Sequence, residues 1–280
     1  MDTMISMNII RRAGVLIAGL PAAALILAAC SSGGGGPAGG GSARAPLPPR
    51  QALLTAATQA QRMTSATELV IIQASGIQSE TITGTIRARL KPSLRLAASL
   101  ILAEPGRSAQ VTEILTGRAL YASGSLVNSP AGKPWVKIDL SALKGTAAAS
   151  VTPLIHSLQS SNLRDQTELL TVATNTRAAG TQTIDGVPTT EYAGSLNAAE
   201  AQQALPAGLR TALAPQLQPL GNNTISFHIW IDGQNDVRKF TDVVTVNGET
   251  VHATATITAL NQPVHVTLPP ASQTATLPGL

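Results

Sequence analysis

Several segments of the chain alternate between apolar and polar residues with a period of two, the pattern of a β-strand with one covered and one solvated face. In residues 80–90, ETITGTIRARL, apolar or small residues hold the even positions from 82 on, and threonine or arginine holds the odd ones. Residues 93–102, SLRLAASLIL, repeat the pattern after Pro92. The side chains predicted to point to the covered face are Ile82, Ile86, Leu90, Leu94, Leu96, Phe227, Ile229 and Ile231. Those predicted to point to solvent are Thr83, Arg87, Arg89 and His228.

The same pattern predicts strands along much of the remaining chain. The turn pair Asp185-Gly186 lies within residues 179–196 and predicts a tight hairpin there. Asn247-Gly248 predicts a second one between two C-terminal runs. The further predicted strands are residues 67–74, 108–117, 118–123, 136–140, 223–232, 237–246 and 249–260, with residues 263–270 as a last edge strand ended by Pro269 and Pro270.

Other stretches carry apolar residues at helical spacing. Residues 50–66 place Leu53, Leu54, Ala57 and Ala60 on one face, and the preceding Pro49 suits a helix start. The further predicted helices are residues 153–160, 164–173, 197–205 and 208–217, with breaks at Pro206 and Pro215. This order of elements predicts an α+β fold, in which helices cover the concave face of one curved antiparallel sheet.

The N-terminal residues have the three-part layout of a secretory signal. Arg11 and Arg12 precede an apolar run that reaches Ala29, and small residues stand just before Cys30. A retained membrane anchor is the alternative, but the run is slightly short and contains Pro21. Leu27-Ala28-Ala29-Cys30 resembles the bacterial lipobox, in which the cysteine receives a diacylglyceryl group and becomes the first residue of the mature protein. Cys30 is the single cysteine, so no disulfide can form within the chain.

A segment dominated by glycine, serine, alanine and proline follows the cysteine, from residue 31 to residue 49. Such a composition cannot bury enough apolar surface to fold. A flexible chain of this length spans roughly 25 Å. We therefore expect a signal peptide at 1–29, a lipidated cysteine and tether at 30–49, and one folded domain at 50–280.

Charge and candidate chemistry exclude several classes of function. The net charge of +4 is small and scattered, which argues against a nucleic-acid groove. The histidines, His156, His228, His252 and His265, are not spaced as metal ligands, and DGQNDV at 232–237 lacks the residues of a calcium loop. No nucleophile motif or phosphate-binding loop occurs in the folded part. We expect no catalytic residue, no metal, no cofactor and no enzymatic activity.

The apolar positions of the strands offer two readings. Small residues among them, such as Gly84, Ala88 and Ala98, leave room on the covered face for a cavity that binds an apolar ligand. Alternatively, helices fill that room and form an ordinary core. The residues that would line the cavity are Ile82, Ile86, Ala88, Leu90, Leu96, Ala98, Phe227, Ile229 and Ile231.

Four blocks of the sequence resemble the actinobacterial LppX/LprG-type lipoproteins, which are related in fold to the LolA carrier. The blocks are KPWVKIDLSAL, GTQTIDGVPTTEYAGSL, ISFHIWIDGQNDVRKF and NQPVHVTLPPASQ, in that family's order. The resemblance implies a half-barrel sheet closed by helices over a hydrophobic cavity, and the binding or carriage of acylated lipids in the cell envelope.

The sequence thus predicts a lipoprotein held on the extracytoplasmic face of the cell membrane by acyl groups on Cys30. Its expected partners are that membrane and an acylated lipid ligand, with no nucleic acid, and it leaves any protein partner open. The alternative function is an envelope sensor or partner-binding scaffold whose core is packed and free of ligand.

Overall fold

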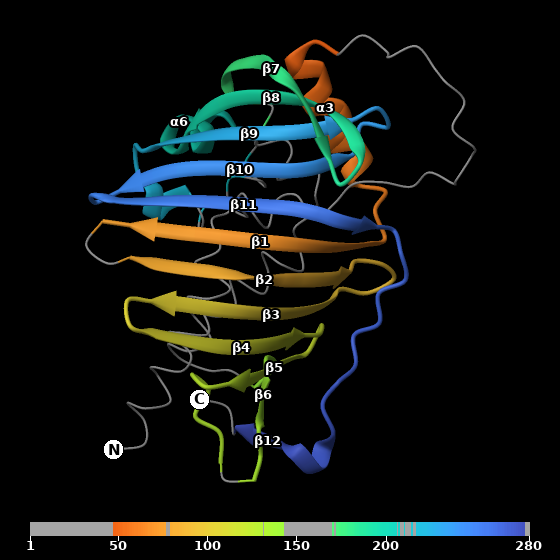
Figure 1. Cartoon of the computed structure of the whole chain (residues 1–280), viewed down its shortest axis with the longest axis vertical. Coiled ribbons are helices and arrows are strands. Elements are labelled where there is room, and N and C mark those ends of the chain that lie inside the picture. The colour runs from red at the N-terminus through yellow and green to blue at the C-terminus, as the bar shows by residue number, and fades with distance from the viewer. Residues whose placement is uncertain are drawn as a thin grey trace.

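In the computed structural model, the described residues form one twelve-stranded sheet with two α-helices (Figure 1). The structure describes residues 47–76, 79–130, 132–142, 170, 172–205, 207, 210, 214 and 217–277. The strands are β1 (Ser65–Ser75), β2 (Glu80–Arg89), β3 (Arg95–Glu104), β4 (Arg107–Leu115), β5 (Ala119–Gly124), β6 (Trp135–Asp139), β7 (Thr174–Ile184), β8 (Val187–Asn197), β9 (Thr224–Asp232), β10 (Val237–Val246), β11 (Glu249–Leu260) and β12 (Thr274–Leu277). The helices are α3 (Pro49–Ala60) and α6 (Ala198–Ala204), with short 3₁₀ turns at Gln218–Leu220 and Ala271–Gln273.

The sheet is open and mixed, and its order is β12-β6-β5-β4-β3-β2-β1-β11-β10-β9-β8-β7. Every pair of neighbours is antiparallel except β6 and β12, which are parallel. The described chain is therefore mostly β, rather than the α+β fold with a purely antiparallel sheet that the sequence predicts. The helix expected at 153–160 lies outside the described residues, as do most of the residues of the helices expected at 164–173 and 208–217.

Both described helices agree with sequence signals. Helix α3 has proline at its first position, where a backbone N–H would have no partner within the helix, and it buries Ala52, Leu53 and Ala56. Helix α6 begins after Asn197, whose side-chain oxygen accepts a hydrogen bond from the Glu200 backbone N–H at 3.0 Å. The predicted helices at 50–66 and 197–205 are thus confirmed, the first of them ending earlier than expected.

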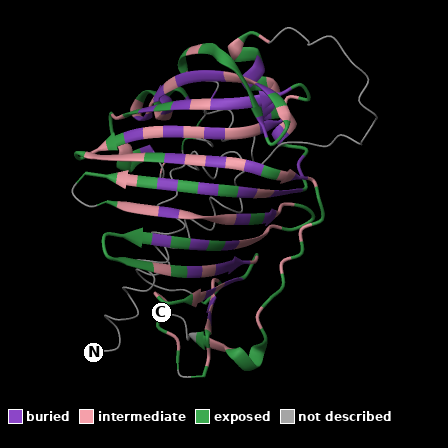
Figure 2. Cartoon of the chain, viewed as in Figure 1, coloured by how far each residue is buried: buried purple, intermediate pink, exposed green. Residues whose placement is uncertain are grey.

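The period-two alternation is confirmed in the central strands. Ile82 and Ile86 are buried, whereas Arg87 between Ile86 and Ala88 is exposed. Figure 2 shows the same alternation of buried and exposed positions along the neighbouring strands. The hairpin turns at Asp185-Gly186 and Asn247-Gly248 are also confirmed, and all four residues have positive φ, as a type I′ turn requires.

The prediction of an edge strand at residues 263–270 is wrong. This segment has no regular structure and runs past the ends of β1 to β4, from β11 in the middle of the sheet down to β12 (Figure 1). Three prolines, at positions 263, 269 and 270, remove backbone donors that a strand ladder needs. The chain pairs only after them, where Thr274–Leu277 adds to β6. The Lys133 ammonium donates a hydrogen bond to the Ser272 carbonyl at 2.5 Å, which holds the segment before β12 close to the loop before β6.

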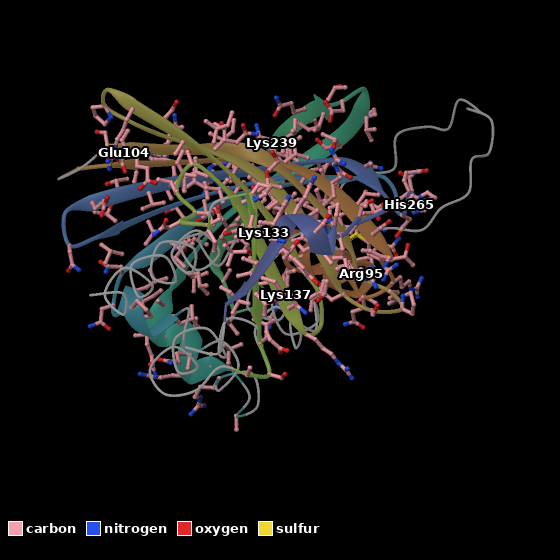
Figure 3. The ribbon with its side chains drawn as sticks, turned by 90° about the horizontal axis from the view of Figure 1, so that it is seen from below. Arg95, Glu104, Lys133, Lys137, Lys239 and His265 are labelled. Carbon is pink, nitrogen blue, oxygen red and sulfur yellow. The ribbon has the colours of Figure 1, made fainter. Side chains whose placement is uncertain are left out.

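Helices α3 and α6 lie on the same side of the sheet, which we call the inner face. Their buried residues form one hydrophobic cluster with Phe227, Ile229 and Ile231 of β9. Figure 3, seen from below, shows α6 (teal) on one side of the sheet and the labelled Lys239 on the other. The outer face therefore carries the alternate residues of each strand.

Candidate functional site

Strand pairing arranges the inward side chains in rows that cross the sheet, because residues directly opposite each other in an antiparallel pair point to the same face. We name three of these rows by their members. Row one is Phe227, Asp242, Ala253, Ile72, Ile82 and Leu102. Row two is Ile229, Phe240, Ala255, Val70, Gly84, Leu100 and Val111. Row three is Glu68, Ile86, Ala98, Glu113, Ala122 and Val136.

The predicted cavity residues share the inner face but divide between two clusters. Phe227, Ile229 and Ile231 pack with the helices in the first cluster, and Leu90 packs against its edge. Ile82, Ile86 and Ala98 belong to a second cluster, and Leu96 packs against that one. Ala88 is buried but belongs to neither. The second cluster consists of residues from β1, β2, β3, β4 and β11, together with Leu126.

The inward glycines do not leave free space, contrary to what the sequence suggests for Gly84. A Cβ at Gly84 would come within 2.1 Å of the Ser99 carbonyl oxygen and 2.8 Å of Leu100 Cδ2. On β8, a Cβ at Gly194 would lie 2.6 Å from the ring of Phe227. Neighbouring atoms therefore occupy the space beside both glycines. Among the small inward residues, only the alanines could leave room for a ligand.

Three carboxylic acids lie on the inner face among these aliphatic side chains. Glu68 of β1, Glu113 of β4 and Asp242 of β10 are 2%, 1% and 2% exposed. One carboxyl oxygen of each has no hydrogen-bond partner among the described residues. Burial raises the pKa of Glu68 and of Glu113 to about 8, and that of Asp242 to about 7. Both glutamic acids are therefore mainly protonated at neutral pH, and a protonated carboxyl can donate a hydrogen bond as well as accept one.

The sequence reasoning missed these three acids, although the signal was present. Glu68 has the same parity as Val70 and Ile72, and Asp242 comes two residues after Phe240. When an acidic residue occupies a strand position of the same parity as the covered apolar residues, the pattern predicts that its carboxyl is buried.

The outer face carries a polar cluster at β8, β9 and β10. His228 Nδ1 lies 2.5 Å from Glu191 Oε1, and its ring stacks on Trp230 with 6.0 Å between centroids. The Lys239 ammonium lies 4.6 Å from the centre of the Trp230 ring. The side chain of His228 is 44% exposed, and His252 and His265 are exposed as well, which confirms the solvent-facing reading of these three.

The three described histidines give no sign of a metal centre. Among the described residues, no group of three or more His, Cys, Asp or Glu side chains could hold a metal ion. His156 lies outside those residues. The DGQNDV segment forms the hairpin turn between β9 and β10, where Arg238 Nε donates to Asp232 Oδ2 at 2.7 Å. This confirms the reading of the segment as a turn.

The predicted lipidation site, Cys30, lies outside the described residues, as do the predicted signal peptide and nearly all of the tether. In the part of the chain that the structure describes, no helix combines the length and apolar character needed to cross a bilayer. The anchoring of the chain therefore stays a prediction from its sequence.

Comparison with known proteins gives matches in structure alone, since no protein-family model and no curated protein sequence matches the chain. The chain is similar in structure to two mycobacterial proteins, LprF and the lipoprotein LppX. LprF of Mycobacterium bovis matches with 13% identity and a TM-score of 0.48, over 79% of this chain and 96% of LprF. LppX of Mycobacterium tuberculosis matches with 17% identity and a TM-score of 0.47, over 78% of this chain and 97% of LppX.

A LolA superfamily protein from Nitrosomonas europaea matches more distantly, with 9% identity and a TM-score of 0.26, over 75% of this chain and 92% of that protein. The structure is thus similar to LprF, LppX and a LolA superfamily protein, the kinds of protein that the sequence blocks resemble. This similarity identifies neither a ligand nor a site.

Proposed function

We propose that the chain is a lipoprotein of the extracytoplasmic side of the cell membrane, and that its inner face binds the acyl chains of a lipid or another apolar ligand. The observation that carries the proposal is the inner face itself. Together its rows cross the sheet from β6 to β9, and their members are nearly all buried and aliphatic, aromatic or small. A face of this kind suits a hydrocarbon chain, because binding needs no directional polar contact along the chain's length.

The second cluster is the better place for the ligand. The first cluster already has occupants, since Leu53 of α3 and Ala201 of α6 pack into it. The second contains inward alanines at 98, 253 and 255, and in the described residues no helix contributes to it. Burial contributes about 25 cal/mol per Å², so an acyl chain that hides a few hundred Å² of apolar surface gains several kcal/mol there.

The anchor is the second part of the proposal. The lipobox-like sequence ending at Cys30 supplies an attachment point, and the following glycine-rich segment supplies a spacer. The proposed partners are accordingly the membrane, through acyl groups on Cys30, and an acylated lipid. No nucleic-acid partner is proposed, because the chain's charge of +4 is small. The chain is proposed to be a binding protein and not an enzyme.

A packed scaffold without ligand is the second candidate. The filled space at Gly84 and Gly194 favours it, because a glycine leaves the most room on a covered face unless its neighbours occupy that room. In that case the chain would act through its outer face, as a sensor or as a partner for another envelope protein.

The amount of lipid that co-purifies with the protein distinguishes a lipid-binding protein from a packed scaffold. The full chain with Cys30→Ala is expressed in bacteria, and bound lipid is measured by native mass spectrometry. We compare it with the same chain carrying Ala98→Trp, which would fill the second cluster, or Ser99→Trp, which adds the same ring on the outer face next to it. Ala98→Leu is a milder version of the first change.

Binding at the inner face predicts lipid in the parent chain, a several-fold loss with Ala98→Trp, a smaller loss with Ala98→Leu, and no change with Ser99→Trp. Circular dichroism establishes that each variant is folded. Equal lipid in the folded Ala98 and Ser99 variants, or no lipid in the parent, would leave the packed scaffold as the better account.

A further inference from the structure

The three inward acids are unusual for a face that otherwise serves as a hydrophobic core. Buried polar groups in folded proteins nearly always have a hydrogen-bond partner, and an unmade bond is costly. Glu68, Glu113 and Asp242 each leave one oxygen without a partner among the described residues. Three such groups on one face of one sheet call for a physical reason.

Among the described residues, ion pairing does not provide that reason. The members of rows one, two and three, all on described strands, include no lysine or arginine. Desolvation is the cause that raises the pKa of each of the three acids. Glu68 and Glu113 are therefore mainly uncharged carboxyls at neutral pH, and each has a hydrogen-bond donor and an acceptor.

Position makes two of them suitable for one ligand. Glu68 and Glu113 lie in row three, with Ile86 and Ala98 between them. Neighbouring strands are about 4.8 Å apart, so three strand steps separate the two acids by roughly 14 Å. Glu113 has alanine on both sides, Ala98 on β3 and Ala122 on β5, so its two neighbours within the row are small.

The chemistry of these groups selects the ligand. A protonated carboxyl can donate to an ester carbonyl or to a hydroxyl, and it can accept from a hydroxyl. A phosphate or a free carboxylate would have to be buried beside them with no lysine or arginine in the described rows, which is strongly unfavourable. The complementary ligand is an uncharged lipid that combines long acyl chains with ester or hydroxyl groups.

We propose that Glu68 and Glu113 hydrogen-bond the ester or hydroxyl oxygens of an uncharged acyl ester, such as a diacylglycerol, on the inner face of the sheet. This inference rests on the proposed function, and it adds a ligand class and two specificity-determining residues to it. Asp242, in row one, is not required by the proposal.

The test compares three probes on the full chain carrying Cys30→Ala: a diacylglycerol, the phosphatidic acid with the same acyl chains, and a hydrocarbon of similar length. The variants are Glu113→Met and Glu68→Met, which keep the shape of the side chain and remove its hydrogen bonds. Glu113→Gln keeps a donor and an acceptor. Gln110→Met, at an exposed position of the same strand β4, is the matched control.

We expect the parent to prefer diacylglycerol to phosphatidic acid by at least tenfold. Each methionine variant should weaken diacylglycerol binding roughly tenfold, the effect of one hydrogen bond. Hydrocarbon binding should not change in these variants. Glu113→Gln should retain most of the diacylglycerol affinity, and Gln110→Met all of it.

The outcomes separate the two proposals. If the parent binds hydrocarbon and diacylglycerol but the methionine variants bind both as tightly, the acids do not recognise the ligand, and the proposed function still stands. A parent that prefers phosphatidic acid would overturn the role of the acids in the same way. If the parent binds none of the three probes, the proposed function fails and this inference fails with it.

Discussion

The buried carboxyl of Glu68 should make the protein less stable as the pH rises from about 5 to 8. Its pKa is raised from the ordinary 4.5 to about 8 by burial, so the folded chain binds the proton more tightly than the unfolded chain does. The stabilisation is fully present below pH 4.5 and is lost as the pH climbs to the pKa of the folded state. This direction is opposite to that of a salt-bridged carboxylate.

The size of the effect follows from the shift. One pKa unit corresponds to about 1.4 kcal/mol, so the rise from 4.5 to about 8 amounts to roughly 5 kcal/mol for Glu68. Local rearrangement and water entry relieve part of the cost of a buried carboxylate, which makes this figure an upper bound. We expect a loss of about 1–5 kcal/mol in the free energy of unfolding.

Glu68→Gln removes the titrating group and keeps the side chain's shape. At pH 5 the variant and the parent should have similar free energies of unfolding, because both side chains are then mainly uncharged. At pH 8 the variant should be the more stable of the two by about 1–5 kcal/mol. The measurement is urea unfolding at both pH values and constant ionic strength. Glu104→Gln, at a partly exposed carboxylate paired with Arg107, is the control that should leave the slope with pH nearly unchanged.

Two results would refute the reasoning. One is a parent whose stability rises between pH 5 and pH 8 by as much as that of the Glu68→Gln variant. The other is a variant that is less stable than the parent at pH 8, since the carboxylate would then have a stabilising partner.

Three further predictions test the anchor, the sheet and a helix cap. Cys30→Ala should abolish lipidation and release the chain from membrane fractions, and detection of the same lipid-modified mass in the variant would contradict this. Gly84→Ala should destabilise the fold by about 1–3 kcal/mol in urea unfolding, because its Cβ would collide with the Ser99 carbonyl; an unchanged midpoint would show that the strands move apart freely. Asn197→Ala should cost about 1 kcal/mol through loss of the bond from the Glu200 N–H, whereas Asn197→Asp should retain most of the stability.

Much of the sheet could be predicted from the sequence, because each strand has one covered face and the period of two is visible in the residues. Ile82 and Ile86 are inward and Arg87 is outward, as the alternation requires. The turn at Asn247-Gly248 could also be predicted, because both residues have positive φ, which asparagine and glycine adopt more readily than other residues. These are local signals, decided by neighbours within a few positions.

Features decided by distant neighbours could not be predicted. Nothing local in Thr274–Leu277 indicates that it pairs in parallel with β6. Gly84 looked like free space, but the Leu100 side chain that fills it comes from the paired strand. The division of the inward residues into two clusters depends on where α3 and α6 pack, which alternation alone does not contain.

The inward acids bear on the choice between a packed scaffold and a binding protein. In the helix-covered part of the inner face, Phe227 stacks on Phe240 with 6.1 Å between ring centroids, as in an ordinary core. A core of that kind gains nothing from Glu113, since methionine or leucine there would fill the same space without an unmade hydrogen bond. A polar group that lowers stability when it is alone is reasonable if a partner meets it during function, and perturbed buried acids gather at such sites in proteins. The two glutamic acids of row three therefore favour the proposal of a ligand on the inner face, whose polar groups would then lie at β1 and β4, away from the stacked phenylalanines.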